Sequence, residues 1–108
     1  MSLTQKTCVP CQGGIPPLTV DEAKGFMDQV PGWELSPASD RINRKFSFAD
    51  FVAALDFVNR VGALAEEEGH HPDISFGWGY ADITFLTHKI KGLHENDFIM
   101  AAKVNALA

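Results

Sequence analysis

The 108-residue sequence predicts an α+β fold, a four-stranded antiparallel sheet with three helices packed on one face, in the order α-β-β-α-β-β-α. Helix-start signatures occur three times along the chain, each a capping residue followed three positions later by an acidic side chain. Between them lie two pairs of short stretches with strand-like composition, and each pair is separated by turn-forming residues. Strands joined by short turns pair antiparallel, and such a sheet buries one face under helices.

The first part of the domain predicts one helix and two strands. A helix over about residues 20–29 begins at Thr19, which can form a capping box with Glu22 three positions later. A strand that begins at 33–35 and a second near 41–46 flank a segment rich in serine and proline, which is typical of a turn.

The second helix, over about residues 48–68, is the longest predicted element. Ser47 is its expected N-cap, with Asp50 at the third helical position. Glu66 lies near the edge of the inward-facing stripe on the last turns, whereas Glu68 is expected to face solvent. Apolar residues at helical spacing predict the buried stripe, namely Phe48, Phe51, Val52, Leu55, Val58, Gly62 and Ala65.

A β-hairpin is predicted over about residues 73–78 and 81–87. Gly79 at the first central position favours a two-residue type II′ turn through Gly79 and Tyr80. This register places His71 directly opposite His88, and directly opposed residues have Cβ atoms about 5 Å apart. His70 then lies one residue earlier, at the end of the long helix.

The last helix is predicted to begin at His94 and to run to the C-terminus. Asp97 stands at its third helical position, and Leu93 and Phe98 are spaced to form a hydrophobic staple around the cap. This arrangement makes His94 a capping or surface residue rather than a catalytic one.

We expect a single domain over residues 18–108, preceded by a flexible N-terminal arm over residues 1–17. The arm carries Cys8 and Cys11 in a Cys-Val-Pro-Cys arrangement. Three interpretations of this pair remain open: thiols of a flexible tail, one half of a zinc site, or a redox motif. A redox motif would sit at a helix start, and the glycine- and proline-rich segment 13–17 that follows forbids a helix there.

Composition excludes several classes of function. The net charge of −5 argues against direct nucleic-acid binding, which needs clustered lysine and arginine. No run approaches the ~20 apolar residues that span a bilayer, and the N-terminus lacks the apolar core of a signal peptide. We therefore expect a cytoplasmic protein with no membrane partner.

Three of the four histidines fall within a short stretch of the chain, at His70, His71 and His88. One interpretation is a metal site with an open position for water. Against it, adjacent residues of an extended segment point to opposite faces, so His70 and His71 should diverge. The other interpretation is acid–base chemistry, because a free imidazole titrates near pH ~6.5 and a carboxylate such as Glu66 or Asp97 can fix its tautomer.

These residues, in this order and spacing, resemble the signature of the pterin-4a-carbinolamine dehydratases. The likeness covers roughly residues 18–108. Its elements are Glu66-x3-His70-His71-Pro72, Trp78, Thr87-His88, Gly92-Leu93, Asp97, Gly32-Trp33 and the Phe46-x-Phe48-x-Asp50-Phe51 segment.

The resemblance implies a metal-free and cofactor-free dehydration in tetrahydrobiopterin recycling. The substrate is the 4a-hydroxytetrahydropterin that aromatic amino acid hydroxylases release, and the product is quinonoid dihydropterin. Family members are dimers or tetramers, so a homo-oligomer is expected. The implied catalytic residues are His70, His71 and His88, and the implied substrate-binding residues are Glu66, Thr87 and Asp97.

Two positions depart from the animal members of that family. Gly69 stands where those proteins carry an acidic residue, and Asn96 stands where they carry arginine, so the preferred pterin may differ while the three histidines are kept. The alternative function is that of a non-catalytic dimerisation or assembly cofactor for a protein partner. Relatives with only a scaffold role tend to lose active-site histidines, which favours the enzyme.

Overall fold

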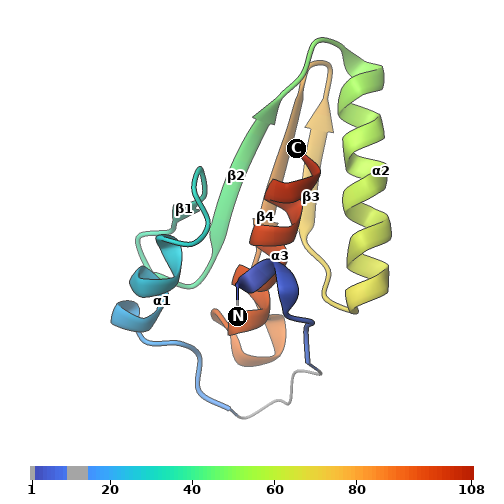
Figure 1. Ribbon diagram of the computed structural model, residues 1–108. Helices are drawn as coiled ribbons and strands as arrows, with labels where there is room; N and C mark the ends of the chain where they lie inside the picture. The colour runs from blue at the N-terminus through green and yellow to red at the C-terminus, as the bar shows by residue number, and fades with distance from the viewer. Residues whose placement is uncertain (1, 10–14) are drawn as a thin grey trace.

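The fold is an antiparallel sheet backed by helices (Figure 1), and the computed structural model describes residues 2–9 and 15–108. The sheet order is β1-β2-β4-β3, with every neighbouring pair antiparallel, so the predicted α+β fold is confirmed. Within the described residues, no helix combines the length and the apolar character needed to cross a membrane. The elements are η1 (Leu3–Gln5), α1 (Val20–Met27), β1 (Glu34–Leu35), β2 (Ile42–Ser47), α2 (Phe51–Glu68), β3 (Asp73–Gly77), β4 (Tyr80–Phe85), η2 (His88–Ile90) and α3 (Glu95–Leu107), where η marks a short 3-10 helix.

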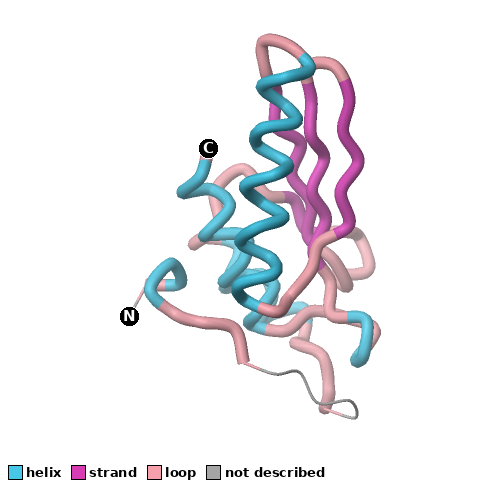
Figure 2. The backbone as a smooth tube through the Cα atoms, turned by 90° about the vertical axis from the view of Figure 1, so that its right-hand side faces the viewer, coloured by secondary structure: helices cyan, strands magenta, loops and turns pink. Residues whose placement is uncertain are grey.

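The core lies between the sheet and the two longer helices, α2 and α3, which cover the same face (Figure 2). Phe57 of α2, Phe85 of β4 and Phe98 of α3 are all fully buried. The ring of Phe26 in α1 stacks on Phe98 at a centroid distance of 5.0 Å, which fixes α1 against α3. The sheet, α2 and α3 therefore share one hydrophobic core that holds the ends of these elements in place.

The predicted N-cap of α2 is wrong. The cap is Asp50, whose side chain accepts a hydrogen bond from the backbone N–H of Ala53 at 2.8 Å. Ser47 is instead the last residue of β2 and pairs with Tyr80. The strand pairing continues as far as Phe48, whose N–H donates to the carbonyl of Gly79 at 2.8 Å, so the helix starts later.

The buried stripe of α2 also differs from the prediction. Ala54, Phe57, Val61 and Ala65 are buried, whereas Phe51, Val52 and Leu55 are 43%, 72% and 36% exposed. Residues 51–55 of α2 are all apolar, so this first stretch does not show which face the sheet covers; Asp56, Asn59 and Arg60 mark the exposed side.

The hairpin turn lies one residue earlier than predicted. Gly77 pairs with Tyr80 and Ile74 with Ile83, which makes Trp78 and Gly79 the central residues. Gly79 has a φ of +81°, and glycine at the second central position is what a type II turn requires. The predicted pairing of His71 with His88 is therefore wrong, and β3 itself begins only at Asp73.

Residues 2–9 pack against the domain, whereas the sequence led us to expect a flexible arm. Leu3 is only 4% exposed and belongs to the hydrophobic core. Lys6 Nζ lies 2.6 Å from Oε2 of Glu95 at the start of α3. These contacts join residues far apart in sequence, which local patterns do not reveal. A division of the chain at residue 17 stays a prediction, and Cys11 lies outside the described residues.

Candidate active site

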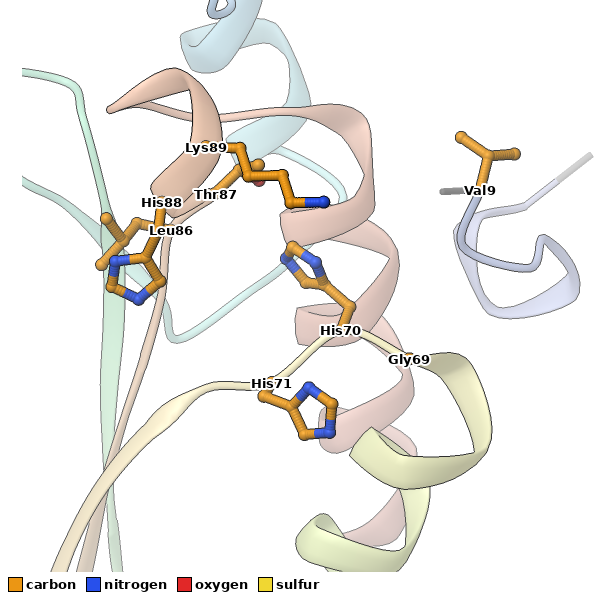
Figure 3. Close-up of a pocket in the computed structure, with 8 residues that line it drawn as sticks. All are labelled: Val9, Gly69, His70, His71, Leu86, Thr87, His88 and Lys89. Atoms are coloured by element: carbon orange, nitrogen blue, oxygen red, sulfur yellow. The ribbon is translucent and has the colours of Figure 1, made fainter. Parts of the chain in front are cut away.

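A pocket of about 410 Å³ opens where the C-terminal end of α2 approaches the segment that follows β4 (Figure 3). Its volume falls within the ~300–1,000 Å³ that is usual for small-molecule sites. All three of the predicted catalytic histidines line it, and so does the predicted binding residue Thr87. The lining residues are Val9, Gly69, His70, His71, Leu86, Thr87, His88 and Lys89.

The end of α2 delivers two of the histidines to this pocket. Gly69 caps the helix in the left-handed conformation, with a φ of 68°, and its N–H donates to the carbonyl of Ala65 at 2.9 Å. Glycine adopts this conformation without the steric cost that a Cβ imposes. The chain therefore turns sharply out of the helix, and His70 and His71 follow at once.

His70 is held by a buried carboxylate. Its Nε2 lies 2.6 Å from Oδ1 of Asp97, and the side chain of Asp97 is fully buried. Asp97 also accepts hydrogen bonds from the hydroxyl of Thr87 at 2.8 Å and from the N–H of His94 at 2.9 Å. The His70 ring lies nearly parallel to that of Phe85, with centroids 6.2 Å apart. Because an ionised carboxylate only accepts, Nε2 of His70 carries the hydrogen and Nδ1 is left for a ligand.

His71 has its own carboxylate partner, but on the surface. Its Nε2 forms a short contact with Oε2 of Glu66, five residues earlier on α2. The side chains of His71 and Glu66 are 58% and 79% exposed. Glu66 does not line the pocket, so the structure places it behind His71 rather than against a ligand.

His88 and Thr87 belong to the connection between β4 and α3. His88 begins η2 and presents an exposed imidazole on the side of the pocket away from Val9 (Figure 3). Thr87 is buried, and its N–H donates to the carbonyl of Gly92 at 2.8 Å. This N–H is therefore engaged within its own loop, and the hydroxyl of Thr87 supports Asp97.

Sequence reasoning missed several pocket residues. Val9 carried no signal, because nothing in its local sequence indicates that the arm reaches the site. Lys89 could have been found as the neighbour of His88, and Figure 3 shows it on the same segment. Gly69 was noted only as a departure from a related signature, although its role as the cap of α2 is what turns the chain.

Cys8 lies beside the pocket in an environment that disfavours its thiolate. Burial, followed by the nearby Glu68 carboxylate, raises the pKa of the Cys8 thiol to about 12. Its Sγ donates weakly to the carbonyl of Asn96 at 3.8 Å. Redox attack uses the thiolate, so this docked position disfavours it. Within the described part of the chain, no group of three or more histidine, cysteine, aspartate or glutamate side chains is arranged to hold a metal ion.

The fold and the site define a small α+β protein that gathers imidazoles around one pocket and backs two of them with carboxylates. A family model described as pterin 4 alpha carbinolamine dehydratase matches residues 16–107. The chain belongs to this family, which confirms the resemblance seen in its sequence.

Relatives of known name agree with this assignment. A protein of Methylococcus capsulatus, to which pterin-4-alpha-carbinolamine dehydratase activity is ascribed by name, is 62% identical over 107 residues, covering 99% of this chain and 94% of its own. A protein of Halorhodospira halophila, ascribed the same activity, is 58% identical over 107 residues, covering 99% of this chain and 98% of its own. These names support the same enzyme class for this chain.

Two solved structures share the fold. A transcriptional coactivator/pterin dehydratase from Brucella melitensis superposes with a TM-score of 0.80 at 34% identity, covering 85% of this chain and 98% of its own. A pterin dehydratase-like protein identified as a RuBisCO assembly factor in the alpha-carboxysome gives a TM-score of 0.62 at 31% identity, covering 71% and 89%. The fold is therefore shared by a protein named as a dehydratase and by one named as an assembly factor.

Proposed function

We propose that this protein dehydrates 4a-hydroxytetrahydropterin to quinonoid dihydropterin and water by histidine acid–base catalysis. The C4a hydroxyl receives a proton and leaves as water when the C4a–O bond breaks. The N5 lone pair forms the new N5=C4a bond, and the proton on N5 is removed. One proton is delivered and one is taken, so the reaction needs a donor and an acceptor but no net change in charge.

The observation that carries this proposal is the meeting of three imidazoles at one pocket in a chain of this family. His71 is our choice for the main proton-transfer residue, because the imidazole and its Glu66 partner are both exposed enough to exchange protons with water. His70 is fixed by Asp97 and suits the role of binding and polarising the pterin. His88 lies across the pocket, where it can act on the other reacting atom.

The residues of the chain itself carry every step of this mechanism, so we propose that it needs neither metal nor cofactor. The substrate would come from an aromatic amino acid hydroxylase, and the reaction would serve tetrahydrobiopterin recycling in the cytoplasm. Asp97 would act through His70, since its carboxylate contacts the imidazole, and the Thr87 hydroxyl would act through Asp97, to which it donates.

The direct test is the decay of chemically generated 4a-hydroxytetrahydropterin, followed by absorbance with and without the purified protein. We expect catalytic amounts of protein to accelerate the decay in proportion to their concentration. A decay rate that matches the buffer alone would reject the proposed activity.

The second candidate is a role in the assembly of a protein partner, alone or beside catalysis. The alpha-carboxysome relative supports it at the level of fold. Exposed apolar side chains on α2 and on the hairpin turn, Phe51, Val52, Leu55 and Trp78, could be covered by a protein. A second copy of the same chain would also cover them, and we propose a homodimer or homotetramer on this basis.

A further inference from the structure

The N-terminal arm supplies one wall of the pocket. Val9 lines it together with His70, His71 and His88, although at least 60 residues separate Val9 from each of them along the chain. In Figure 3 Val9 stands on the opposite side of the site from His88. Its side chain is apolar and 55% exposed, so it can contact a ligand without first leaving the core.

The backbone of Val9 is held by the side chain of Asn96. The N–H of Val9 donates to Oδ1 of Asn96 at 3.1 Å, and Nδ2 of Asn96 donates to the carbonyl of Val9 at 2.7 Å. Asn96 is only 2% exposed, so this pair of hydrogen bonds is shielded from water. An amide side chain that satisfies both backbone groups of one residue fixes the position and the direction of that residue.

Two further contacts secure the same segment. The N–H of Cys8 donates to Oε1 of Glu68 at 2.8 Å, and the other carboxylate oxygen of Glu68 lies 3.6 Å from Nζ of Lys103. The Glu68 side chain is only 8% exposed, so it is not the solvated residue that the sequence suggested. Lys6, two residues before Cys8, pairs with Glu95.

These anchors are the immediate neighbours of the catalytic machinery. Glu68, at the end of α2, is two residues before His70. Asn96, at the start of α3, is the residue before Asp97. The arm therefore joins the same two helix ends that the contact between His70 and Asp97 joins. Docking of the arm and placement of His70 therefore both depend on how the end of α2 lies relative to the start of α3.

We propose that Val9 is a substrate-contacting residue that limits the size of the pterin side chain, and that Asn96 and Glu68 are positioning residues that hold it there. This inference rests on the proposed dehydratase function. The family match begins at residue 16, so the arm lies outside the part of the chain that the family model describes. Removing methyl groups from an apolar wall enlarges the pocket, and a single methylene in such a wall can change discrimination by ~10-fold or more.

The first experiment compares Val9→Ala and Val9→Trp with wild type, on a carbinolamine with a methyl group at C6 and on one with the longer dihydroxypropyl group. Val9→Ala should raise KM for the methyl substrate about three- to tenfold, with kcat changed less than twofold, because Val9 is half exposed. Val9→Trp should raise KM mainly for the longer substrate. Val20→Ala is the matched control, since Val20 is 48% exposed at the start of α1 and lies outside the pocket.

The second experiment tests the positioning role of Asn96. Asn96→Ala should reproduce the rise in KM, and adding Val9→Ala to it should have little further effect, because Val9 is no longer held. Alkylation of Cys8 by iodoacetamide, in a Cys11→Ser background, reports arm docking independently of activity. Asn96→Ala should speed this alkylation several-fold, and saturating 7,8-dihydrobiopterin should slow it in the protein that keeps Asn96.

The outcomes separate this inference from the proposed function. If the parent protein turns over neither carbinolamine, the dehydratase proposal fails first. If it turns over both, and Val9→Ala and Val9→Trp leave both KM values within twofold of wild type, the role of Val9 is overturned. Should Asn96→Ala prove unstable, a chain lacking residues 2–9 replaces it, and an unchanged KM in that chain overturns the inference equally.

Discussion

His70 and Asp97 form a buried pair in which Nε2 of the imidazole lies 2.6 Å from Oδ1 of the carboxylate. Asp97 is at the same time the third residue of α3, where it accepts the N–H of His94 and completes the helix cap. One carboxylate therefore stabilises a helix start and orients an imidazole of the site. A change at Asp97 should affect both stability and turnover.

Asp97→Asn should separate these two effects. The amide keeps an oxygen that can accept from His94, but it removes the charge and presents a donor to His70 or Thr87. We expect turnover to fall about 10- to 100-fold, less than the loss that follows removal of a catalytic imidazole. Steady-state kinetics and denaturant unfolding of the same variant measure the two effects. Unchanged turnover would show that His70 does not need this partner.

The thiol of Cys8 should be unusually slow to react while the arm is docked. Burial beside Glu68 raises its pKa from the ordinary value of 9.0 to about 12. At pH 8 the thiolate is therefore scarcer than in a free thiol, and alkylation in a Cys11→Ser background should be at least about 10-fold slower than in the unfolded chain. Mass spectrometry of timed samples measures this rate. Equal rates would mean that the arm is undocked in solution.

The same shift predicts how pH affects docking. Because the pKa is raised in the docked state, the free thiol ionises first as the pH rises above 9.0, and the docked arm loses stability until the docked thiol ionises near 12. Below pH 9.0 the Cys8 thiol is protonated whether the arm is docked or free, so its contribution to the stability of docking is at its full value and does not change with pH. A Cys8→Ser variant is the matched control, since its hydroxyl does not titrate in this range.

Leu3→Ala should destabilise the protein. Leu3 is 4% exposed within the core, and burial of a leucine side chain contributes about 1.5–3 kcal/mol. Thr4→Ala serves as the control, because Thr4 is exposed on the same short helix. Urea unfolding followed by circular dichroism measures both variants. A midpoint for Leu3→Ala equal to that of wild type would show that burial of Leu3 contributes nothing to the stability of the folded state.

Val52→Asp should weaken the proposed self-association. Val52 is 72% exposed on α2, next to the exposed Phe51 and Leu55. A charge placed in an apolar interface is costly to bury, so the variant oligomer should already dissociate at protein concentrations at which the wild type stays assembled. Gln29→Glu adds the same charge at an exposed position just after α1 and should leave association unchanged. A single wild-type species of about 12 kDa in micromolar sedimentation would reject the homo-oligomer.

Local sequence patterns were enough to predict most of the fold. The capping boxes at Thr19 and His94 are present, and each lies at the start of the predicted helix. These signals involve residues three apart, so the sequence contains the whole interaction. The class of fold followed from the order of such elements, because short turns between strands leave few topologies.

The errors arose where two local solutions were equally good. Glycines at 77 and 79 allow more than one turn, and the pairing of β3 with β4 places Trp78 and Gly79 at its centre. Docking of the arm depends on Asn96 and Glu68, whose partners lie 87 and 60 residues away. The place of Glu66 near the histidines could be foreseen from helix geometry, and the role of Asp97 came from the family resemblance, since 27 residues separate it from His70. The presence of Val9 at the pocket could not be foreseen.

The most direct test of the central claim is the rate of 4a-hydroxytetrahydropterin decay with wild type and with each of His70→Ala, His71→Ala and His88→Ala, in the presence and absence of a chelator. We predict that His71→Ala lowers turnover most, by ~10²–10⁴-fold, and that a double change of His71 and His88 loses less than the product of the single effects. The chelator should change nothing. Abolition of wild-type activity by the chelator, or wild-type turnover in all three variants, would contradict metal-free catalysis by these histidines.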